Sequence, residues 1–221
     1  MAIITISREL GSMGSEIAQI LEQKLKYRII DKETLTAELF QQGFTDMKKY
    51  DEKQPSLYNR FTSENYIYIH FLQSALYKFA EKGRCILLGR GGQYFFCDLP
   101  GTMKIHVITP YKLRLQRIKV RFSCESPKAE KIMQTSDRER SGFYNFFFNI
   151  DWHDSRLYDL VINTQHLSPK KAVEIIIDAL PVFEVRLTHW LPVPCVRPWH
   201  IHELIMSLSL YLFRKLIVCH E

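Results

Sequence analysis

Residues 7–16, S-R-E-L-G-S-M-G-S-E, have the composition of a phosphate-binding loop and directly follow a short apolar run at the N-terminus. Two glycines, Gly11 and Gly14, precede a stretch with helical periodicity. At such a turn from strand to helix, backbone N–H groups and the helix dipole can hold a phosphate. The same pattern also fits a plain tight turn, so its meaning depends on what surrounds it.

The loop departs from the usual mononucleotide pattern G-x-x-x-x-G-K-[ST], in which the lysine reaches the terminal phosphates and the hydroxyl faces Mg²⁺. The chain has no Gly-Lys pair. Arg8 is the nearest cation that could replace the lysine. Ser12 or Ser15 could supply the hydroxyl, and we assign Mg²⁺ to Ser15. We expect the phosphate contacts to come from the backbone of Gly11, Ser12, Met13, Gly14 and Ser15.

Further arginines gather at two places along the chain. Arg90 follows the apolar run 85–88, at a strand end where open α/β sheets bind ligands. A guanidinium there can make paired hydrogen bonds to a phosphate. Arg114, Arg117 and Arg121 recur at helical spacing and share one helix face. The alternative for each arginine is an ordinary solvated basic surface.

These side chains must be positioned by a sheet. Apolar runs without alternation recur along the chain, which indicates strands covered on both faces. Stretches with helical periodicity separate the runs, and Ser-Pro pairs at 126–127 and 168–169 mark two helix starts. We predict an α/β fold with a doubly wound, five-stranded parallel sheet. Its strands are expected near residues 2–6, 27–30, 85–88, 105–109 and 159–162.

The motifs, taken in order, resemble those of the cytidylate kinase-like proteins. That branch of the nucleoside monophosphate kinases typically has S-R-E-x-G-S-G-G as its phosphate loop, similar to residues 7–14 here. The resemblance continues through Y-R-I-I-D-K, L-G-R-G-G, an R-x-x-R helix, D-R-E-R and Y-D-L-V-I-N-T, and covers roughly residues 1–180. It implies a P-loop NTPase fold with a lid. It also implies phosphoryl transfer from ATP to a nucleoside monophosphate, most simply CMP or dCMP.

The resemblance also implies roles for individual residues. Arg138 and Arg140, in a lid at 121–150, would close over the transferring phosphoryl group and act with Arg8 as the catalytic residues. Cations suit this role because the charge lies on the non-bridging oxygens. Acceptor binding is expected from segment 41–65 and from Asp31, Arg60, Arg90 and Asp137. Instead of binding the acceptor, Asp31 could equally cap a helix that starts at Lys32.

The chain departs from the family pattern at the end of the third strand. Leu88 stands where these kinases have an acidic residue, and Gly91 stands where they have Asp. With the missing lysine, these departures keep two alternatives open. One is a kinase fold that binds nucleotides without transferring phosphate, and the other is a small-molecule kinase with a different acceptor. Mg²⁺, bound with ATP, is the expected cofactor.

Composition limits the class of protein. With 221 residues, 46% of them hydrophobic and 24% charged, the chain is neither collagen-like nor of low complexity nor wholly disordered. Its net charge of +6 suits phosphate-bearing partners. The five cysteines are widely spaced, which predicts reduced thiols in a cytoplasmic protein. The longest apolar run, 204–213, is too short to span a bilayer, so we expect no membrane partner.

Two other patterns favour less specific interpretations. Residues 181–221, which we treat as a C-terminal extension after a kinase-like domain at 1–180, contain His and Cys residues that match no standard zinc spacing. The aromatic block at 143–148 could stack on single-stranded nucleic acid. Such blocks more often pack in a lid or a core, and we expect no nucleic-acid partner.

Overall fold

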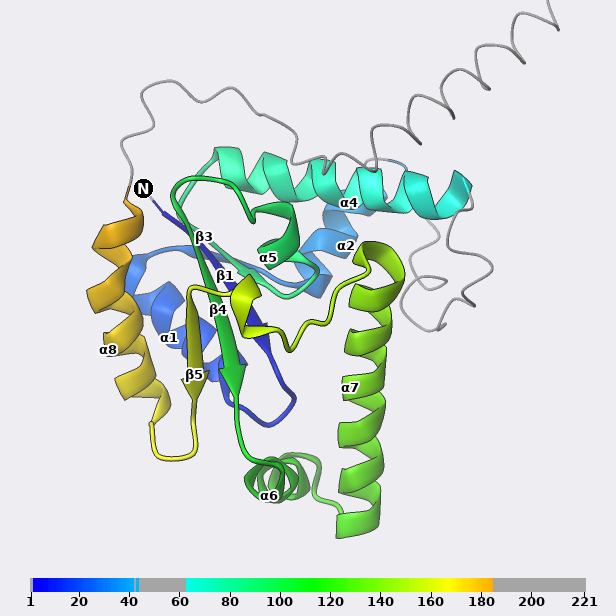
Figure 1. Ribbon diagram of the computed structural model, residues 1–221, viewed down its shortest axis with the longest axis vertical. Coiled ribbons are helices and arrows are strands. Elements are labelled where there is room, and N and C mark those ends of the chain that lie inside the picture. The colour runs from blue at the N-terminus through cyan, green and yellow to red at the C-terminus, as the bar shows by residue number, and fades with distance from the viewer. Residues whose placement is uncertain (1, 42, 44–62, 185–221) are drawn as a thin grey trace, which may run out of the picture. The chain divides into compact units, whose positions relative to one another are not determined.

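The computed structural model describes residues 2–41, 43 and 63–184 of the chain. The strands of this part form a parallel sheet in the order β2-β3-β1-β4-β5 (Figure 1). Each strand overlaps one of the predicted apolar runs, and every pairing between neighbours is parallel. The five-stranded parallel sheet is therefore confirmed. The strands are β1 (Ile3–Arg8), β2 (Arg28–Ile30), β3 (Cys85–Leu88), β4 (Thr102–Ile108) and β5 (Leu160–Asn163).

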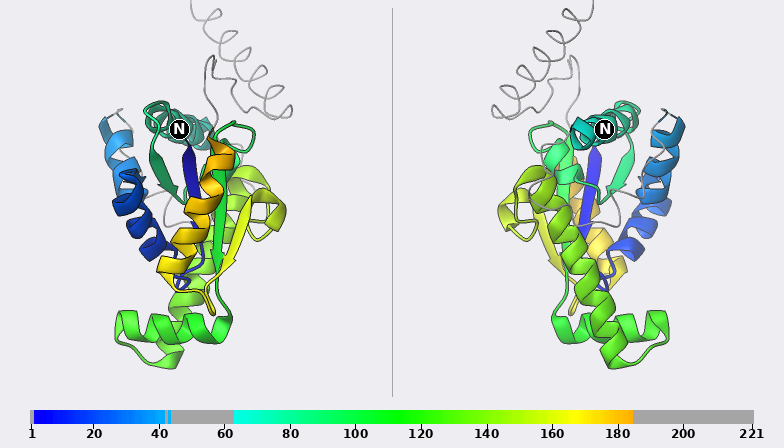
Figure 2. Two further views of the ribbon diagram at one scale, coloured as in Figure 1. Left: turned by 90° about the vertical axis from the view of Figure 1, so that its left-hand side faces the viewer. Right: turned by 90° about the vertical axis from the view of Figure 1, so that its right-hand side faces the viewer.

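Helices cover both faces of the sheet, as a doubly wound fold requires (Figures 1 and 2). On one face, α1 (Gly14–Leu25) and α8 (Pro169–Ala179) bury Ile17, Leu21 and Ile176 against β1 and β4. On the other face lie α2 (Lys32–Gln41), α4 (Ser63–Glu81), α5 (Gly92–Phe95) and the C-terminal half of α7 (Ser126–Phe148). Because successive side chains on a strand point to opposite faces, Ile3 and Ile4 enter different cores.

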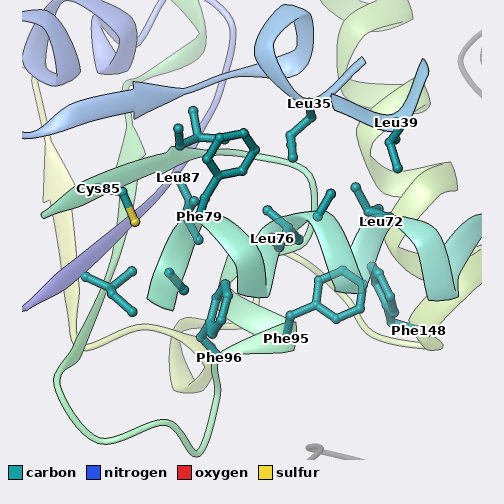
Figure 3. Packing of buried hydrophobic residues seen from close by; sticks show 14 of the residues in the cluster. Leu35, Leu39, Leu72, Leu76, Phe79, Cys85, Leu87, Phe95, Phe96 and Phe148 are labelled. Carbon is teal, nitrogen blue, oxygen red and sulfur yellow. The ribbon is translucent and has the colours of Figure 1, made fainter. Parts of the chain in front are cut away.

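The core on the α4 side is rich in aromatic rings (Figure 3). Leu72 and Leu76 of α4 lie beside Phe95 and Phe96, and Phe148 arrives from the last turn of α7. The aromatic block at 143–148 therefore contributes to this core: Tyr144, Phe146 and Phe148 are buried. This placement matches the interpretation of the block as packing residues.

The segment predicted as a lid, 121–150, consists mainly of one helix, α7, preceded by the last two residues of α6 (Tyr111–Phe122). α6 ends at Ser123, and α7 begins at Ser126 and runs without interruption for 23 residues. The expected cap position differs by one residue: Ser126 is the first helical residue, and Glu125 is the cap. Pro127 is tolerated at that point because N–H groups in the first turn need no helical partner.

Packing of the predicted kinase-like domain continues slightly beyond residue 180. Leu180 is buried in the α1/α8 core, and Phe183 packs against it within a short 3₁₀ turn, Leu180–Phe183. Most of the predicted acceptor segment 41–65, and residues 185–221 of the predicted extension, lie outside the described residues. Among the helices that are described, none is long and apolar enough to cross a membrane.

The strand order determines where the loops meet. β1 lies between β3 and β4, and Ile6 of β1 pairs with both Leu88 and Ile105. The C-terminal ends of the three strands therefore bring the loops that follow them to one edge of the sheet. In open α/β sheets this edge is where ligands bind.

Candidate functional site

A pocket of about 690 Å³ lies at the C-terminal end of β1. Its walls come from the loop after β1, the first turn of α1 and one face of α6, and Arg140 of α7 also lines it. Four of the five predicted phosphate-loop residues line this pocket: Gly11, Met13, Gly14 and Ser15. The backbone at the start of α1 thus faces open space, as anion binding at a helix N-terminus requires.

Ser12, the fifth predicted loop residue, is completely buried. Its hydroxyl donates a hydrogen bond of 2.8 Å to the carbonyl oxygen of Glu9 and so closes the turn. Ser15 is only partly buried and lines the pocket. Of the two serines, Ser15 is therefore the one whose hydroxyl is placed to meet a ligand. Met13 adopts a left-handed φ of 65°, at the position where the family pattern has glycine.

Arg117 of α6 fixes this loop from the side. Its guanidinium donates hydrogen bonds of 3.1 Å to the carbonyl oxygen of Gly11 and 2.9 Å to that of Thr164. The Thr164 hydroxyl in turn donates to the carbonyl oxygen of Ser12, at 2.9 Å. The end of β5 and α6 therefore hold the loop in place before any ligand binds. Such preorganisation lowers the cost of ordering a loop on binding.

Arg114 connects the same loop to α7. It is 5% exposed and donates a hydrogen bond of 2.8 Å to the carbonyl oxygen of Leu10. It also pairs with Glu9 at 3.4 Å and with Asp137 at 2.6 Å. Both carboxylates are therefore occupied by a buried cation. The structure thus places Asp137, predicted to bind the acceptor, in contact with Arg114.

The side chain of Arg8 extends from the predicted phosphate loop towards the end of β3. A Cβ atom at Gly14 would lie 2.5 Å from the Cβ of Arg8, and one at Gly89 would lie 2.4 Å from its Nη1. Only residues without side chains therefore allow this path. At its far end, Nη1 donates a hydrogen bond of 3.2 Å to the carbonyl oxygen of Leu88. Arg8 thus joins the phosphate loop to the strand that precedes Arg90.

Three arginines lie near these strand ends: Arg8 and Arg140 line the pocket, and Arg8 bonds to the carbonyl oxygen two residues before Arg90. Burial, with the nearby positive charges of Arg140 and Arg90, lowers the pKa of Arg8 to about 10. Burial also lowers the pKa of Arg140. Its Nη1 donates to the hydroxyl of Ser136 at 2.6 Å, and its Cζ lies 5.9 Å from the centroid of the Trp152 ring. Positive charges that lower one another's pKa in this way mark a place where an anion would be stabilised.

The other predicted residues lie in varied surroundings. Arg90 is in a left-handed conformation with φ 55°, and its Cζ lies 5.9 Å from the centroid of Phe143. Asp31 caps α2, since one of its oxygens accepts from both the backbone N–H (2.9 Å) and the hydroxyl (2.8 Å) of Thr34. Arg138 is exposed and does not line the pocket. Arg60 lies outside the described residues.

Few side chains of the site could bind a metal ion. No group of three His, Cys, Asp or Glu side chains among the described residues could hold an ion. Leu88 packs into the α1/α8 core, and Glu9 accepts from the backbone N–H of Thr109 besides pairing with Arg114. Ser15 and Glu16 are the remaining oxygen donors on the loop side of the pocket. This set fits Mg²⁺ that arrives with substrate phosphates, because such ions keep most of their waters and use one or two protein ligands.

Sequence reasoning gave no specific role to Arg114, Arg117 or Thr164, which hold the loop. All three lie in segments that it singled out, the R-x-x-R helix and Y-D-L-V-I-N-T. Helical spacing shows that the arginines share a face, but it does not show which carbonyl oxygens they reach. That information depends on how α6 crosses the end of β1.

Comparisons with known proteins agree with this architecture. Residues 3–166 match the family described as the cytidylate kinase-like family. A cytidylate kinase of Sulfolobus acidocaldarius is 26% identical over 180 residues, covering 80% of this chain and 93% of that protein. One of Methanobrevibacter smithii is also 26% identical, covering 81% and 99%.

A crystal structure of an uncharacterised protein from Eubacterium ventriosum has the same fold. It superposes with a TM-score of 0.66 at 21% identity, and the match covers 82% of this chain and 99% of that one. The predicted P-loop NTPase-type kinase fold is confirmed by the parallel sheet and by these matches together. Because the family match spans most of its length, this chain belongs to the cytidylate kinase-like family.

Proposed function

We propose that the protein transfers the γ-phosphoryl group of ATP to a nucleoside monophosphate, with CMP or dCMP as the preferred acceptor. The observation that carries the proposal is the placement of Arg8 and Arg140 on the wall of the pocket, with Arg8 bonded to the carbonyl oxygen two residues before Arg90. Phosphoryl transfer depends mostly on positioning and on neutralising non-bridging oxygens. Arg8 would bridge donor and acceptor, Arg90 would hold the acceptor phosphate, and Arg140 would neutralise the transferring group.

The acidic residues of the site favour a phosphate over a hydroxyl as the acceptor group. A hydroxyl acceptor benefits from a carboxylate that accepts its proton, whereas a phosphate is already an anion at neutral pH. Glu9 and Asp137 are paired with Arg114, Asp31 caps α2, and Glu16 lies beside Ser15 on the loop side of the pocket, where we place Mg²⁺. The choice of cytidine nucleotides is supported by the names of the two relatives.

Mg²⁺ is part of the proposal as the partner of ATP. Ser15 is the side chain that would face it, with Glu16 nearby on the rim of the pocket. When bound, the ion would share the charge of the phosphates and help to orient them. Arg138 is exposed, so of the two predicted lid arginines we assign the neutralising role to Arg140. We further propose that the enzyme works in the cytoplasm, where buried thiols such as Cys85 remain reduced.

One observation favours a second candidate, a nucleotide-binding module without transfer activity. The chain lacks the lysine of the usual loop, and Arg8 donates to the carbonyl oxygen of Leu88. In this alternative, ATP would bind and no acceptor would be phosphorylated.

The two candidates differ in one assay. ADP release would be followed with ATP and Mg²⁺ in the presence of CMP, dCMP, UMP, AMP, GMP or shikimate. Turnover that depends on CMP or dCMP supports the kinase. Turnover that depends on shikimate alone contradicts the choice of acceptor. Saturable ATP binding without any turnover supports the binding module.

A further inference from the structure

The C-terminal half of α7 is docked onto the loop that carries Arg90. Three side chains of α7, Phe143, Tyr144 and Phe148, contact this loop, residues 89–93. Arg140 lies one helical turn before Tyr144 on the same helix. Arg90 and Arg140 are 50 positions apart in the chain, yet this docking determines their relative position.

The Tyr144 hydroxyl is the polar centre of the contact. It accepts a hydrogen bond of 3.3 Å from the backbone N–H of Gly91 and donates one of 3.2 Å to Oε1 of Gln93. The Gln93 amide nitrogen donates to the Tyr158 hydroxyl at 3.3 Å, and that hydroxyl donates to the carbonyl oxygen of Trp152 at 2.6 Å. All of these bonds are buried. Such bonds restrict position strongly, because breaking one leaves a polar group without a partner away from water.

Packing on either side of the hydroxyl makes the contact rigid. A Cβ atom at Gly91 would lie 2.9 Å from Cε2 of Phe148, and Gly91 has φ 79°. Phe148 also packs beside Phe95, with ring centroids 5.3 Å apart, as Figure 3 shows. On the other side, the Arg90 guanidinium lies over the Phe143 ring. The loop and the helix thus meet at a backbone position where no side chain could be inserted.

From this arrangement we infer that Tyr144 is a positioning residue. Its hydroxyl sets the placement of Arg90, which would hold the acceptor phosphate, relative to Arg140, which would neutralise the transferring group. The inference rests on the proposed function and adds to it a residue that acts through Arg90 without touching the substrate.

Tyr144→Phe removes the hydroxyl and keeps the ring, so it tests the inference with the smallest change. We expect CMP affinity, measured by calorimetry, to fall about tenfold while ATP affinity changes by less than about twofold. In steady-state assays, KM for CMP should rise and kcat should fall, with KM for ATP unchanged. A residue that only stabilised the fold would leave these constants unchanged per folded molecule.

Tyr77→Phe is the matched control. The Tyr77 hydroxyl is a hydrogen-bond donor in the same core, to the backbone carbonyl of Phe95 at 3.2 Å, and this bond does not involve residues 89–91. Tyr77→Phe should leave both affinities unchanged. If it weakens CMP binding as much as Tyr144→Phe does, general loosening of the core is the cause and the inference is overturned.

A double-mutant cycle shows whether the effect passes through Arg90. In an Arg90→Ala background, Tyr144→Phe should weaken CMP binding by less than about twofold, because the residue that it positions is gone. If the two effects simply multiply, Tyr144 acts independently of Arg90 and the inference is overturned.

Failure of the inference and failure of the proposed function give different results. If the wild type binds CMP but does not phosphorylate it, transfer is contradicted and the effect of Tyr144→Phe on CMP affinity still decides the inference. If the wild type phosphorylates CMP and Tyr144→Phe matches it in every constant, the function stands and the inference is overturned. A wild type that does not bind CMP contradicts both.

Discussion

Nη1 of Arg8 occupies the space that a Cβ atom on Gly89 would need, because the two would be only 2.4 Å apart. Residues from the ends of β1 and β3 therefore depend on each other at the centre of the proposed site. The phosphate loop contributes the cation, and the loop before Arg90 contributes the room for it. The lysine of the usual loop is missing, and the Arg8 side chain instead brings a positive charge from the end of β1 towards the end of β3.

Gly89→Ala tests this relationship. The far end of Arg8 is flexible, so we expect the variant to fold while the guanidinium is displaced and CMP-dependent turnover falls about tenfold or more. Gly43→Ala is the matched control, since Gly43 also has a positive φ, +87°, and no atom of the described residues lies within 4 Å of an added Cβ. Both variants should lose about 1 kcal/mol of unfolding free energy from backbone strain. Equal activity in the two variants would show that the position of Arg8 is unimportant.

Gly91→Asp restores the family's carboxylate and should not improve the enzyme. The new Cβ would meet the Phe148 ring at 2.9 Å, on a backbone with φ 79°. We expect a loss of roughly 2 kcal/mol or more in unfolding free energy, measured with urea, from overpacking and strain. Adding Phe148→Leu should recover part of that loss. A stable Gly91→Asp variant with higher Mg²⁺-dependent turnover would contradict this account of the departure.

Arg114→Met should be strongly destabilising. Removing the buried cation leaves Glu9 and Asp137 without their shared partner and the carbonyl of Leu10 without its donor. Breaking a buried ion pair in this way costs about 3 kcal/mol. Arg121→Met is the control, because Arg121 is exposed on the same helix. Comparable midpoints of urea unfolding for the two variants would show that the Arg114 contacts contribute little.

His106 predicts a loss of stability in acid. Burial, then the charges of His153 and Arg140, lower its pKa from 6.5 to about 4. Between these two pH values the unfolded chain therefore binds more protons than the folded protein. The contribution of His106 to the free energy of unfolding is fully present above about pH 6.5 and decreases as the pH drops towards 4. The loss reaches about 3 kcal/mol if the full difference in pKa is realised.

His106→Leu should flatten this acid limb in urea unfolding curves recorded from pH 4 to pH 7. His166→Gln, which changes an exposed histidine, should keep it. An acid limb that is unchanged in His106→Leu would assign the loss to other groups.

The sheet was predictable from local patterns because each strand overlaps a short run rich in apolar residues. The run at 85–88 became β3 with the predicted bounds, and the strand-to-helix turn at Gly14 was visible from its glycines and the periodicity that follows. These features depend on neighbouring residues only. Arg8, Arg90 and Arg140 were also identified individually, from their types and from the family resemblance.

The contacts between distant segments were not predictable in the same way. D-R-E-R presents two similar arginines, but only the helix phase of α7 directs Arg140 into the pocket and leaves Arg138 exposed. The sequence allowed Asp31 either to bind the acceptor or to cap a helix, and the structure shows the cap. The sequence shows only that Gly91 lacks the carboxylate of the family pattern, whereas the structure shows that the Phe148 ring occupies the space beside it. Each of these results depends on a partner more than two residues away, which a motif does not contain.

The central claim is that the protein transfers a phosphoryl group from ATP to a nucleoside monophosphate, with Arg8, Arg90 and Arg140 binding the phosphates. The most direct measurement follows label from γ-³²P-ATP into the nucleoside diphosphate, for the wild type, Arg140→Ala and the exposed control Arg138→Ala. We predict labelled CDP with the wild type, a rate about 10³-fold lower with Arg140→Ala, and a change of less than about threefold with Arg138→Ala. The absence of labelled diphosphate from every nucleoside monophosphate tested, or equal rates for the two arginine variants, would contradict the account.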